Sequence, residues 1–421
     1  MIYKRLPPHD MPYKLRSYGK HSKMVKLENR YKRMCSEIAN LMAHNQNPAF
    51  IKRCKVVLKY YGVKLMQISY VNIPVVPQVQ INARTIESFS EFECYRRFRF
   101  RKDDLSQVFR LLKFPNEVTF DNRSKLSGVE VFLFSLNRFT SHCCLEDLVG
   151  VFGKEYTLWV RAFHWFCSFM YQRWGYLLKN MLHFWVQYFI AFSEKIRRKL
   201  VLLGFPSNLG SCRAAIMIDC TIIASLRPGG GPIGAGGPLA ERWSNWIQMA
   251  FYNGYKHHHG TKWQTLESPT GMCVDMYGPR SFRRSDLTLL ANSGINNKLL
   301  DAQANLPHED QKCAYGDGIY PTLSHILSRQ GNDGMSAIRI ANEWDYGITA
   351  NLFPFIKWRA QQKLLKHHDI SLYYFVATQL RNLSCCLYGN ITATYFETDD
   401  DVLENFCKIS IEDYLSDAHR R

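Results

Sequence analysis

The chain has 421 residues, of which 46% are hydrophobic and 14% aromatic, and its net charge is +18. This composition excludes a mainly disordered protein, and the length allows two or three domains with at least one large core. The positive charge favours a polyanionic partner, most often nucleic acid, over an acidic membrane surface.

Neither the cysteines nor the apolar stretches indicate an extracellular or membrane protein. The 13 cysteines contain no CxxC pair, which argues against a disulfide framework and a classical zinc site. The chain opens on MIYKR rather than on the apolar run of a signal peptide. The most apolar stretch, 181–192, is too short to span a bilayer. We therefore expect a soluble intracellular protein without a membrane partner.

Residues 1–87 are predicted to form a basic N-terminal arm and a connector. Residues 1–35 hold ten lysines and arginines against only Asp10 and Glu28. Such a run is typical of an arm that lies along phosphates or serves as a nuclear import signal, and equally of a plain solvated tail. Residues 47–85 carry many β-branched residues and end in a proline-broken, extended segment, which indicates a connector.

Residues 88–205 are predicted to form a helical, helix-turn-helix-like DNA-binding region. Helices are expected at 128–141, 144–153 and 156–178, with a short middle helix. In that arrangement the third helix enters a DNA groove, and the candidate contacts are Lys154, Tyr156, Thr157 and Arg161. A plain helical bundle is the alternative, because large aromatic side chains usually pack in a core and not against bases. The residues concerned are Trp159, Phe163, Phe166 and Phe169.

Residues 206–396 alternate strand-like and helix-like segments, which predicts an α/β domain. A buried strand is expected at 214–225. Two or three strands are expected at 252–278, around a turn at 268–271.

The second half of this region is expected to be mainly helical. Residues 282–299 have a helical pattern, and residues 336–356 predict a helix that Pro354 interrupts. Between them, residues 313–329 predict a strand, a glycine-flanked acid and a short helix.

Two further segments are predicted to lie outside the regular structure. The glycine-rich stretch 227–238 lacks the GK[ST] ending of a P-loop, so we interpret it as a flexible insertion. Residues 397–421 are rich in acids and predict a tail that is solvated or packed against the basic arm.

Three acids stand where they can serve catalysis. Asp219 lies inside an apolar strand, Asp317 follows a strand between two glycines, and Glu343 follows Arg339 by four residues on one helix face. An unpaired charge in an apolar strand costs several kcal/mol, so Asp219 needs a partner. Taken singly, the three also have ordinary explanations: a structural hydrogen bond, a turn and a helix ion pair.

Carboxylates that converge from two strands and a helix offer the oxygen ligands that Mg²⁺ prefers. Two such ions, Mg²⁺ or Mn²⁺, held roughly 4 Å apart activate a water and stabilise a leaving 3′ oxygen. The three acids therefore predict a site for phosphodiester cleavage.

The ordered motifs of the chain resemble the DDE transposases of the PIF/Harbinger superfamily, which are RNase H-like nucleases. The resemblance covers about 90–356 and depends on MIDCT, YNGYKHHHGTKWQTLESPTG, YGPRSFRRSDLTLL, YGDGIYP and RIANEWDYG. It implies an RNase H-like DDE core, two divalent ions, and metal-binding, catalytic roles for Asp219, Asp317 and Glu343. Supporting roles are implied for Asp286 and Arg339, and the weaker candidates are Asp275 and Asp345.

The histidine run 257–259 does not predict a metal site. Three consecutive residues of a strand alternate between its faces, so they cannot all bind one ion. DNA-backbone contacts or plain surface are expected instead. The candidate DNA contacts in this part of the chain are Lys256, His257, Lys262, Arg283 and Arg284.

We expect a metal-dependent DNA endonuclease of transposase type in the nucleus. It would cut phosphodiester bonds at element ends and join the 3′ ends to target DNA. The resemblance also implies a Myb-like accessory protein, and a homo-oligomer is open. The alternatives are a catalytically inactive DNA-binding or protein-interaction protein derived from such an enzyme, and a nuclease without strand transfer.

Overall fold

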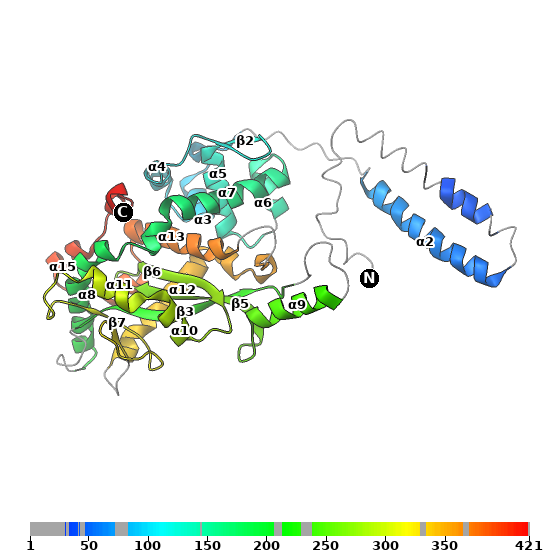
Figure 1. Cartoon of the computed structure of the whole chain (residues 1–421). Helices are drawn as coiled ribbons and strands as arrows, with labels where there is room; N and C mark the ends of the chain where they lie inside the picture. The colour runs from blue at the N-terminus through cyan, green and yellow to red at the C-terminus, as the bar shows by residue number, and fades with distance from the viewer. Residues whose placement is uncertain are drawn as a thin grey trace. The chain divides into compact units, whose positions relative to one another are not determined.

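The computed structural model divides into two compact units, Met1–Val79 and Gln80–Arg421 (Figure 1). The residues that it describes are 30, 33–40, 42, 47–71, 83–143, 145–205, 213–228, 238–328, 334–364 and 370–419. The basic run at 1–35 and the glycine-rich stretch at 227–238 lie largely outside these residues, and so does the proline-broken end of the predicted connector.

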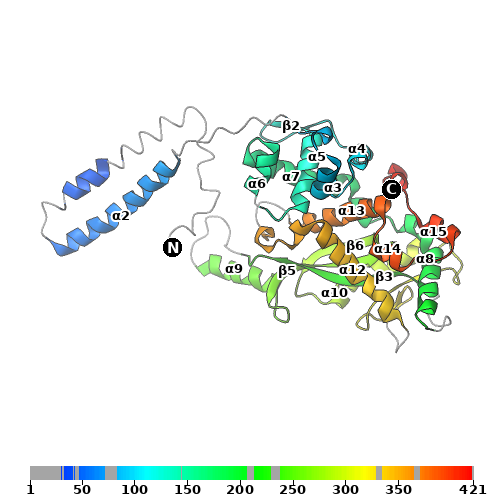
Figure 2. The ribbon, with the colours of Figure 1, turned by 180° about the vertical axis from the view of Figure 1, so that it is seen from behind.

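The first unit contains helix α2 (Pro48–Val71) and a helical stretch at 33–40 (Figure 2). Proline suits the first position of a helix, where its missing N–H has no partner to lose. The half-buried residues recur at intervals of three and four, which places them on one helix face: Ile51, Cys54, Leu58 and Tyr61. No helix was predicted in this stretch, because its β-branched residues hid the helical spacing of these positions.

A six-stranded mixed sheet forms the centre of the second unit, so the predicted α/β class is confirmed. Strands β3 and β5 are antiparallel, as are β5 and β6, whereas β3 and β7, and β7 and β8, are parallel. The order is β4-β5-β3-β7-β8, and β6 also pairs with β5. The strands are β3 (Ala214–Ser225), β4 (Tyr252–Asn253), β5 (His258–Glu267), β6 (Cys273–Ser281), β7 (Cys313–Tyr315) and β8 (Ile326–Leu327).

The strands follow the sequence closely in the first half of the sheet. The predicted strand at 214–225 is β3, and the predicted strands at 252–278 are β4, β5 and β6. The turn between β5 and β6 closes with a hydrogen bond from the N–H of Gly271 to the carbonyl of Ser268, at 2.9 Å.

The short helix predicted after Asp317 is wrong, because strand β8 lies there instead. The N–H of Gly316 donates to the carbonyl of Leu327, and the N–H of Ala314 donates to that of His325, both at 2.9 Å. Buried backbone groups of β7 need such partners, and β8 supplies them.

Helices cover both faces of the sheet. Met217 packs in one cluster with Ile338 of α12 (Met335–Leu352) and with Ile196 and Leu200 of α8 (Leu182–Leu202). Its neighbour in β3, Ile218, points to the other face, as alternation along a strand requires. That face packs against α10 (Asp286–Ser293) and α11 (Ile295–Ala302) through Leu290, Ile295 and Leu299.

The helices predicted at 282–299 and 336–356 are confirmed, the first as α10 and α11 with a break at Gly294. Helix α12 ends at Leu352, two residues before Pro354 begins a 3-10 turn, Pro354–Lys357. A further helix, α13 (Ser371–Tyr388), follows a short 3-10 turn at Arg359–Gln361.

The three helices predicted at 128–178 are present as α5 (Gly128–Thr140), α6 (Leu145–Phe152) and α7 (Tyr156–Trp174). Before them lie α3 (Glu91–Phe98), α4 (Lys102–Leu111) and the hairpin β1 (Glu117–Thr119) and β2 (Lys125–Ser127). A 3-10 turn, Gly175–Leu178, leads on to α8.

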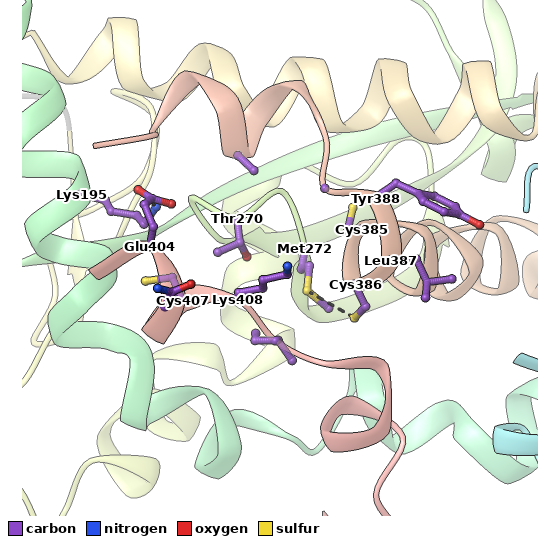
Figure 3. Close-up of a pocket in the computed structure, with 14 residues that line it drawn as sticks. Lys195, Thr270, Met272, Cys385, Cys386, Leu387, Tyr388, Glu404, Cys407 and Lys408 are labelled. Carbon is purple, nitrogen blue, oxygen red and sulfur yellow. Dashed lines mark hydrogen bonds and ion pairs between the residues drawn. The ribbon is translucent and has the colours of Figure 1, made fainter. Parts of the chain in front are cut away.

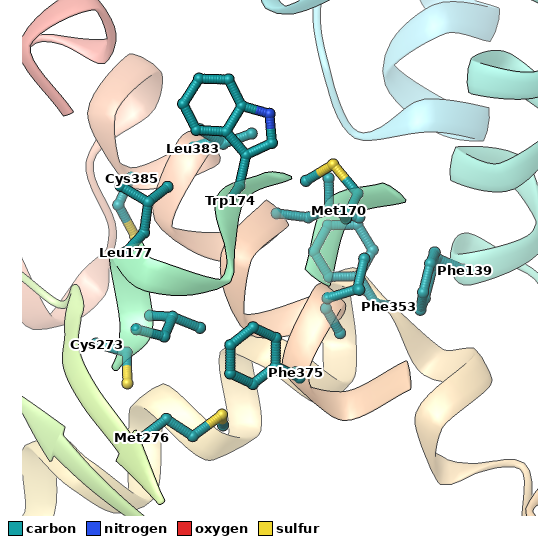
Figure 4. Close-up of a cluster of buried hydrophobic side chains, with 14 of the residues drawn as sticks. Phe139, Met170, Trp174, Leu177, Cys273, Met276, Phe353, Phe375, Leu383 and Cys385 are labelled. Carbon is teal, nitrogen blue, oxygen red and sulfur yellow. The ribbon is translucent and has the colours of Figure 1, made fainter. Parts of the chain in front are cut away.

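This helical region and the sheet region share one hydrophobic core. Figure 4 shows Phe139, Met170 and Trp174 beside side chains from the sheet region, among them Phe353, Phe375, Cys273 and Met276. The residues predicted as a DNA-binding region and as a nuclease domain therefore belong to one compact unit in this structure.

The C-terminal segment is part of the same unit. It forms α14 (Ile391–Tyr395), α15 (Asp401–Cys407) and α16 (Ile411–Tyr414), with buried Ile409, Ile411, Tyr414 and Leu415. Its acids pair with α8: Arg198 contacts Asp400 at 3.2 Å, and Lys195 contacts Glu404 at 2.5 Å. The prediction of a solvated tail is therefore wrong for residues 397–419, because the apolar residues between its acids are buried.

In the part of the chain that the structure describes, none of the helices has both the length and the apolar character needed to cross a membrane.

Candidate active site

Asp219 and Asp317 lie at the place where the sheet becomes open beside β3. Strand β7 pairs with β3 only from Ala214 to Met217, whereas β3 continues to Ser225. Asp219 lies two residues after Met217, and Asp317 lies two residues after Tyr315, which pairs with Met217. Because Met217 and Tyr315 face α12, the alternation of side chains turns Asp219 toward the same face.

Arg339 connects this strand to the helix that covers it. Its Nη1 donates to Asp219 Oδ2 at 3.1 Å, and its Nη2 lies 3.5 Å from Glu343 Oε1 one helical turn further on. The Asp219 side chain is 15% exposed and the Glu343 side chain 59% exposed. The guanidinium therefore links a mostly buried carboxylate to an open one.

The electrostatics of Asp219 reflect its burial and its acidic neighbours. Desolvation raises the pKa of Asp219 to about 6, and the charges of Asp317 and Asp286 add to this rise. The N–H of Cys220, 2.7 Å from Asp219 Oδ1, and the Arg339 guanidinium act in the opposite direction. Negative charge is thus concentrated around one buried carboxylate.

The two glycines around Asp317 have different roles. A Cβ at Gly316 would lie 2.6 Å from the ring of Tyr320, which is buried against this position. A Cβ at Gly318 would meet nothing within 4 Å. The Asp317 turn is held by the N–H of Ile319, which donates to Asp317 Oδ1 at 3.0 Å. The first glycine is therefore required by packing, and the second is not.

Asp286 lies on the face of the sheet opposite Asp219. Its carboxylate contacts the ammonium of Lys262, which is opposite Ile222 in the β3–β5 register. Ile222 is three residues after Asp219, so the two side chains point to opposite faces of the sheet. Lys262, predicted to contact DNA, is mostly buried in this ion pair. Asp286 thus acts on Asp219 through its charge alone.

The weaker candidates Asp275 and Asp345 are both buried. Asp275 contacts Lys298 at 3.2 Å, and Asp345 accepts a hydrogen bond from Thr392 at 2.8 Å. Neither shares the open face with Glu343.

Tyr346 was not singled out by the sequence, although it lies near the candidate site. Its OH is 2.9 Å from Thr265 Oγ1, and Thr265 is the neighbour of Asp219 across the β3–β5 pair. The negative charge of Asp219 adds to the burial that raises the pKa of Tyr346. Tyr346 follows Arg339 by seven residues, about two helical turns, so the sequence places both on one helix face.

The predicted DNA contacts near α7 are placed in different environments. The ammonium of Lys154 donates to the buried Glu130 at 2.6 Å, Tyr156 and Thr157 are half-buried, and Arg161 is exposed. The apolar side of α7 is buried against α5 and α13, which supports the helical-bundle alternative. DNA reading by this helix stays a prediction.

The predicted contacts near β5 are more accessible. The side chains in question, apart from Lys262, are exposed: Lys256, His257, Arg283 and Arg284. His257 lies in the turn before β5, with φ of 53°, and His259 is buried within the strand. The histidines thus have separate surroundings.

The donor atoms of the site suit a hard cation. Within the described ranges, no group of three or more His, Cys, Asp or Glu side chains is placed to hold a metal ion. The residues of the candidate site that offer oxygen ligands to a cation are Asp219, Asp317 and Glu343. Burial raises the pKa of Asp219 most, and the charges of Asp317 and Asp286 add to the rise, so a nearby cation would favour the charged carboxylate.

A separate cavity of about 360 Å³ lies between the β5–β6 turn and the C-terminal helices (Figure 3). Its lining includes Lys195, Thr270, Met272, Cys386 and Glu404, and none of the candidate catalytic residues. Lys195 is paired with Glu404 there, so the cavity contains no uncompensated charge from this lysine.

Comparisons of the chain with protein-family models, with curated proteins and with solved structures find no match.

Proposed function

We propose that the chain is a metal-dependent DNA endonuclease with an RNase H-like core, of the DDE transposase type. The observation that carries this proposal is the position of three carboxylates. Asp219 and Asp317 lie at adjacent parallel strands and Glu343 on the covering helix α12, and Arg339 connects Asp219 to Glu343.

The sheet topology supports the same proposal. Strands β6, β5 and β3 are antiparallel neighbours, and β7 and β8 continue the sheet in parallel from β3. An RNase H-like core has this mixed order, with its first acid on the central strand. Asp219 lies on the central strand, β3.

The reaction would be the attack of a water on a DNA phosphorus. The bond between phosphorus and the 3′ oxygen breaks, and the products are a 3′ hydroxyl and a 5′ phosphate. A divalent cation held by Asp219, Asp317 and Glu343 would activate that water and stabilise the leaving oxygen. Arg339 would orient two of these carboxylates, and Asp286 would add negative charge from behind β3.

A second candidate function is DNA binding without cleavage. The observation that favours it is the contact of Arg339 with both Asp219 and Glu343. A guanidinium in this position supplies positive charge to the acids without any metal ion. A protein whose acids stay paired in this way would bind DNA and not cut it.

The test uses purified protein and labelled duplex DNA that carries candidate element ends, in Mg²⁺, Mn²⁺ or EDTA. We expect nicks only with metal, and none from Asp317→Ala, whose DNA affinity should be nearly unchanged. The matched control is Asp301→Ala, at an exposed acid on α11. A joined product with target DNA would add strand transfer.

Two results would contradict the nuclease proposal. Nicking by Asp317→Ala equal to that of the parent would remove Asp317 from the mechanism. Tight DNA binding without a nick in either metal would favour the second candidate function.

A further inference from the structure

Exposed aromatic side chains gather at the β4 end of the sheet, away from the acids. Tyr255 is 85% exposed and Trp246 63% exposed, and Met249 and Tyr252 are also exposed. Trp246 and Met249 belong to α9 (Pro238–Phe251), and Tyr255 lies in the turn between β4 and β5. With Lys256 and Arg283, these residues form what we name the aromatic-basic surface.

The turn that presents Tyr255 is closed by the side chain of Asn253. Asn253 Oδ1 accepts hydrogen bonds from the N–H groups of Tyr255 and Lys256, both at 3.0 Å. The N–H of Arg283 is held by Ser281, and its Nη1 lies 3.5 Å from the carbonyl of Met249. The α9 end, the β4–β5 turn and the end of β6 therefore form one continuous surface.

The exposed charged side chains of this surface are basic. Among the described side chains from 245 to 286 the acids are Glu267, Asp275 and Asp286, and each is paired, with Arg381, Lys298 and Lys262 respectively. The exposed charged side chains of the same stretch are Lys256, Arg280, Arg283 and Arg284. A surface of this kind attracts a polyanion.

Cations and rings are also paired on this surface and beside it. The ammonium of Lys256 lies 5.2 Å from the centroid of the Tyr255 ring. The guanidinium of Arg280 lies 4.7 Å from that of Tyr277. Exposed rings beside cations suit an unpaired nucleic acid strand, because bases stack on the rings while phosphates contact the cations. A duplex presents its bases already stacked and cannot use the rings.

We propose that the aromatic-basic surface binds unpaired DNA, with a base stacked on Tyr255 and phosphates at Lys256 and Arg283. The choice of DNA rests on the proposed function.

The aromatic-basic surface begins six residues along β3 from Asp219, because Ser225 of β3 pairs with His259, which pairs with Tyr252. At about 3.3 Å per residue this is about 20 Å. At the duplex rise of about 3.4 Å per nucleotide a strand covers this distance in about six nucleotides, and a more extended unpaired strand needs fewer.

The experiment measures binding of the full chain to a fluorescent oligothymidine of about 20 nucleotides. The buffer contains EDTA, so failure of cleavage does not affect the result. We expect Tyr255→Ala to weaken binding about 10-fold and Tyr255→Phe to keep the parent affinity. The matched control is Phe406→Ala, at an exposed ring on the acid-containing helix α15, which should change nothing.

The same titrations with a duplex and with an oligouridine complete the test. We expect the duplex affinity to change less than about 2-fold in Tyr255→Ala. Unchanged oligothymidine affinity in Tyr255→Ala, at an unchanged melting temperature, would overturn the proposal. Tighter binding of oligouridine than of oligothymidine would also overturn it. So would a competition in which heparin displaces the bound oligothymidine completely while mixed-sequence single-stranded DNA of equal charge does not.

Discussion

Two groups of carboxylates lie on opposite sides of helix α12 and differ in what surrounds them. Glu343 turns toward the open group with Asp219 and Arg339, and its side chain is 59% exposed. Asp345, only two residues later, is fully buried beside Arg381 and Glu267. Two residues correspond to about 200° around a helix, so the two acids necessarily occupy different environments.

The buried group is fully enclosed by protein. Arg381 Nη2 donates to Glu267 Oε2 at 2.7 Å, and its Nη1 donates to the carbonyl of Asp345 at 3.1 Å and to Thr349 at 3.2 Å. Burial raises the pKa of Glu267 and that of Asp345. The side chains of Arg381, Glu267 and Asp345 are almost completely shielded from solvent.

The comparison shows that acids beside an arginine do not by themselves mark a functional site. In the buried group the arginine supports the packing of α12 on α13 and β5. In the open group the sheet ends beside β3, and a large part of Glu343 meets solvent. Exposure to solvent, and not the type of residue, distinguishes the open group of acids from the buried group.

The largest expected effect separates the two acids of α12. Glu343→Gln should lower the rate of metal-dependent DNA cleavage by about 100-fold or more, because it removes a ligand charge. Asp345→Asn should change this rate less than about 3-fold. Single-turnover cleavage with both variants checks this, and equal losses would contradict the comparison.

The next effect concerns the two arginines. Arg381→Met should lower the free energy of unfolding by about 3–5 kcal/mol, because it leaves a buried carboxylate without a partner. Adding Glu267→Gln to that variant should restore part of the loss. Arg339→Met, at the open group, should cost less, about 1–2 kcal/mol, because the N–H of Cys220 still donates to Asp219 and Glu343 is exposed.

Urea unfolding of these variants gives the three values. A larger loss from Arg339→Met than from Arg381→Met would show that the open group, and not the buried one, carries the structural role.

A smaller effect distinguishes the glycines on the two sides of Asp317. Gly316→Ala should destabilise the protein by about 1–3 kcal/mol, because its Cβ would meet the buried ring of Tyr320. Gly318→Ala, which meets open space, should stay within about 0.5 kcal/mol. Thermal unfolding of the pair measures the difference, and similar melting temperatures would refute the packing role of Gly316.

The smallest effect is a pH dependence at the buried Asp275. Burial raises the pKa of Asp275 from 3.8 to about 6, while Lys298, and Lys179 more weakly, oppose this rise. Between these two values the unfolded chain releases the proton and the folded chain keeps it. The free energy of unfolding therefore falls as pH rises through this window, by at most about 1.4 kcal/mol per unit, and is constant above it.

Asp275→Asn should remove this slope. Unfolding at several pH values between these limits, for the parent and the variant, measures it. If the free energy of unfolding rose with pH more steeply in the parent than in the variant, the predicted direction of the pH dependence would be wrong.

The sequence predicts the elements around the open site well. The apolar run around Asp219 predicts β3 with its bounds, and the spacing of Arg339 and Glu343 predicts their shared face. Local signals of this kind depend on neighbours along the chain. Strand β8 was not predicted, because its two residues are too few for a local pattern. Helix α2 was not predicted, because its β-branched residues hid its helical spacing.

Other features depend on strand pairing, which no local pattern contains. Asp286 was expected near the catalytic acids, and the register of β5 on β3 places its partner Lys262 on the other face. The exposure of Tyr255 likewise depends on where α9 and β6 end. The apolar residues between the C-terminal acids were present in the sequence, but their burial needs α8 and α13 as a surface.

The hydrogen bonds of Arg381 to the Asp345 carbonyl and to Thr349 have a consequence for the entropy of ligand binding. They hold the backbone of α12 in place from its buried side when the protein folds. The backbone at Glu343 is therefore already ordered before any ligand binds. Its exposed side chain keeps its own rotamer freedom. A ligand at the open face then has to order a few side-chain torsions and not a helix, which lowers the entropic cost of association.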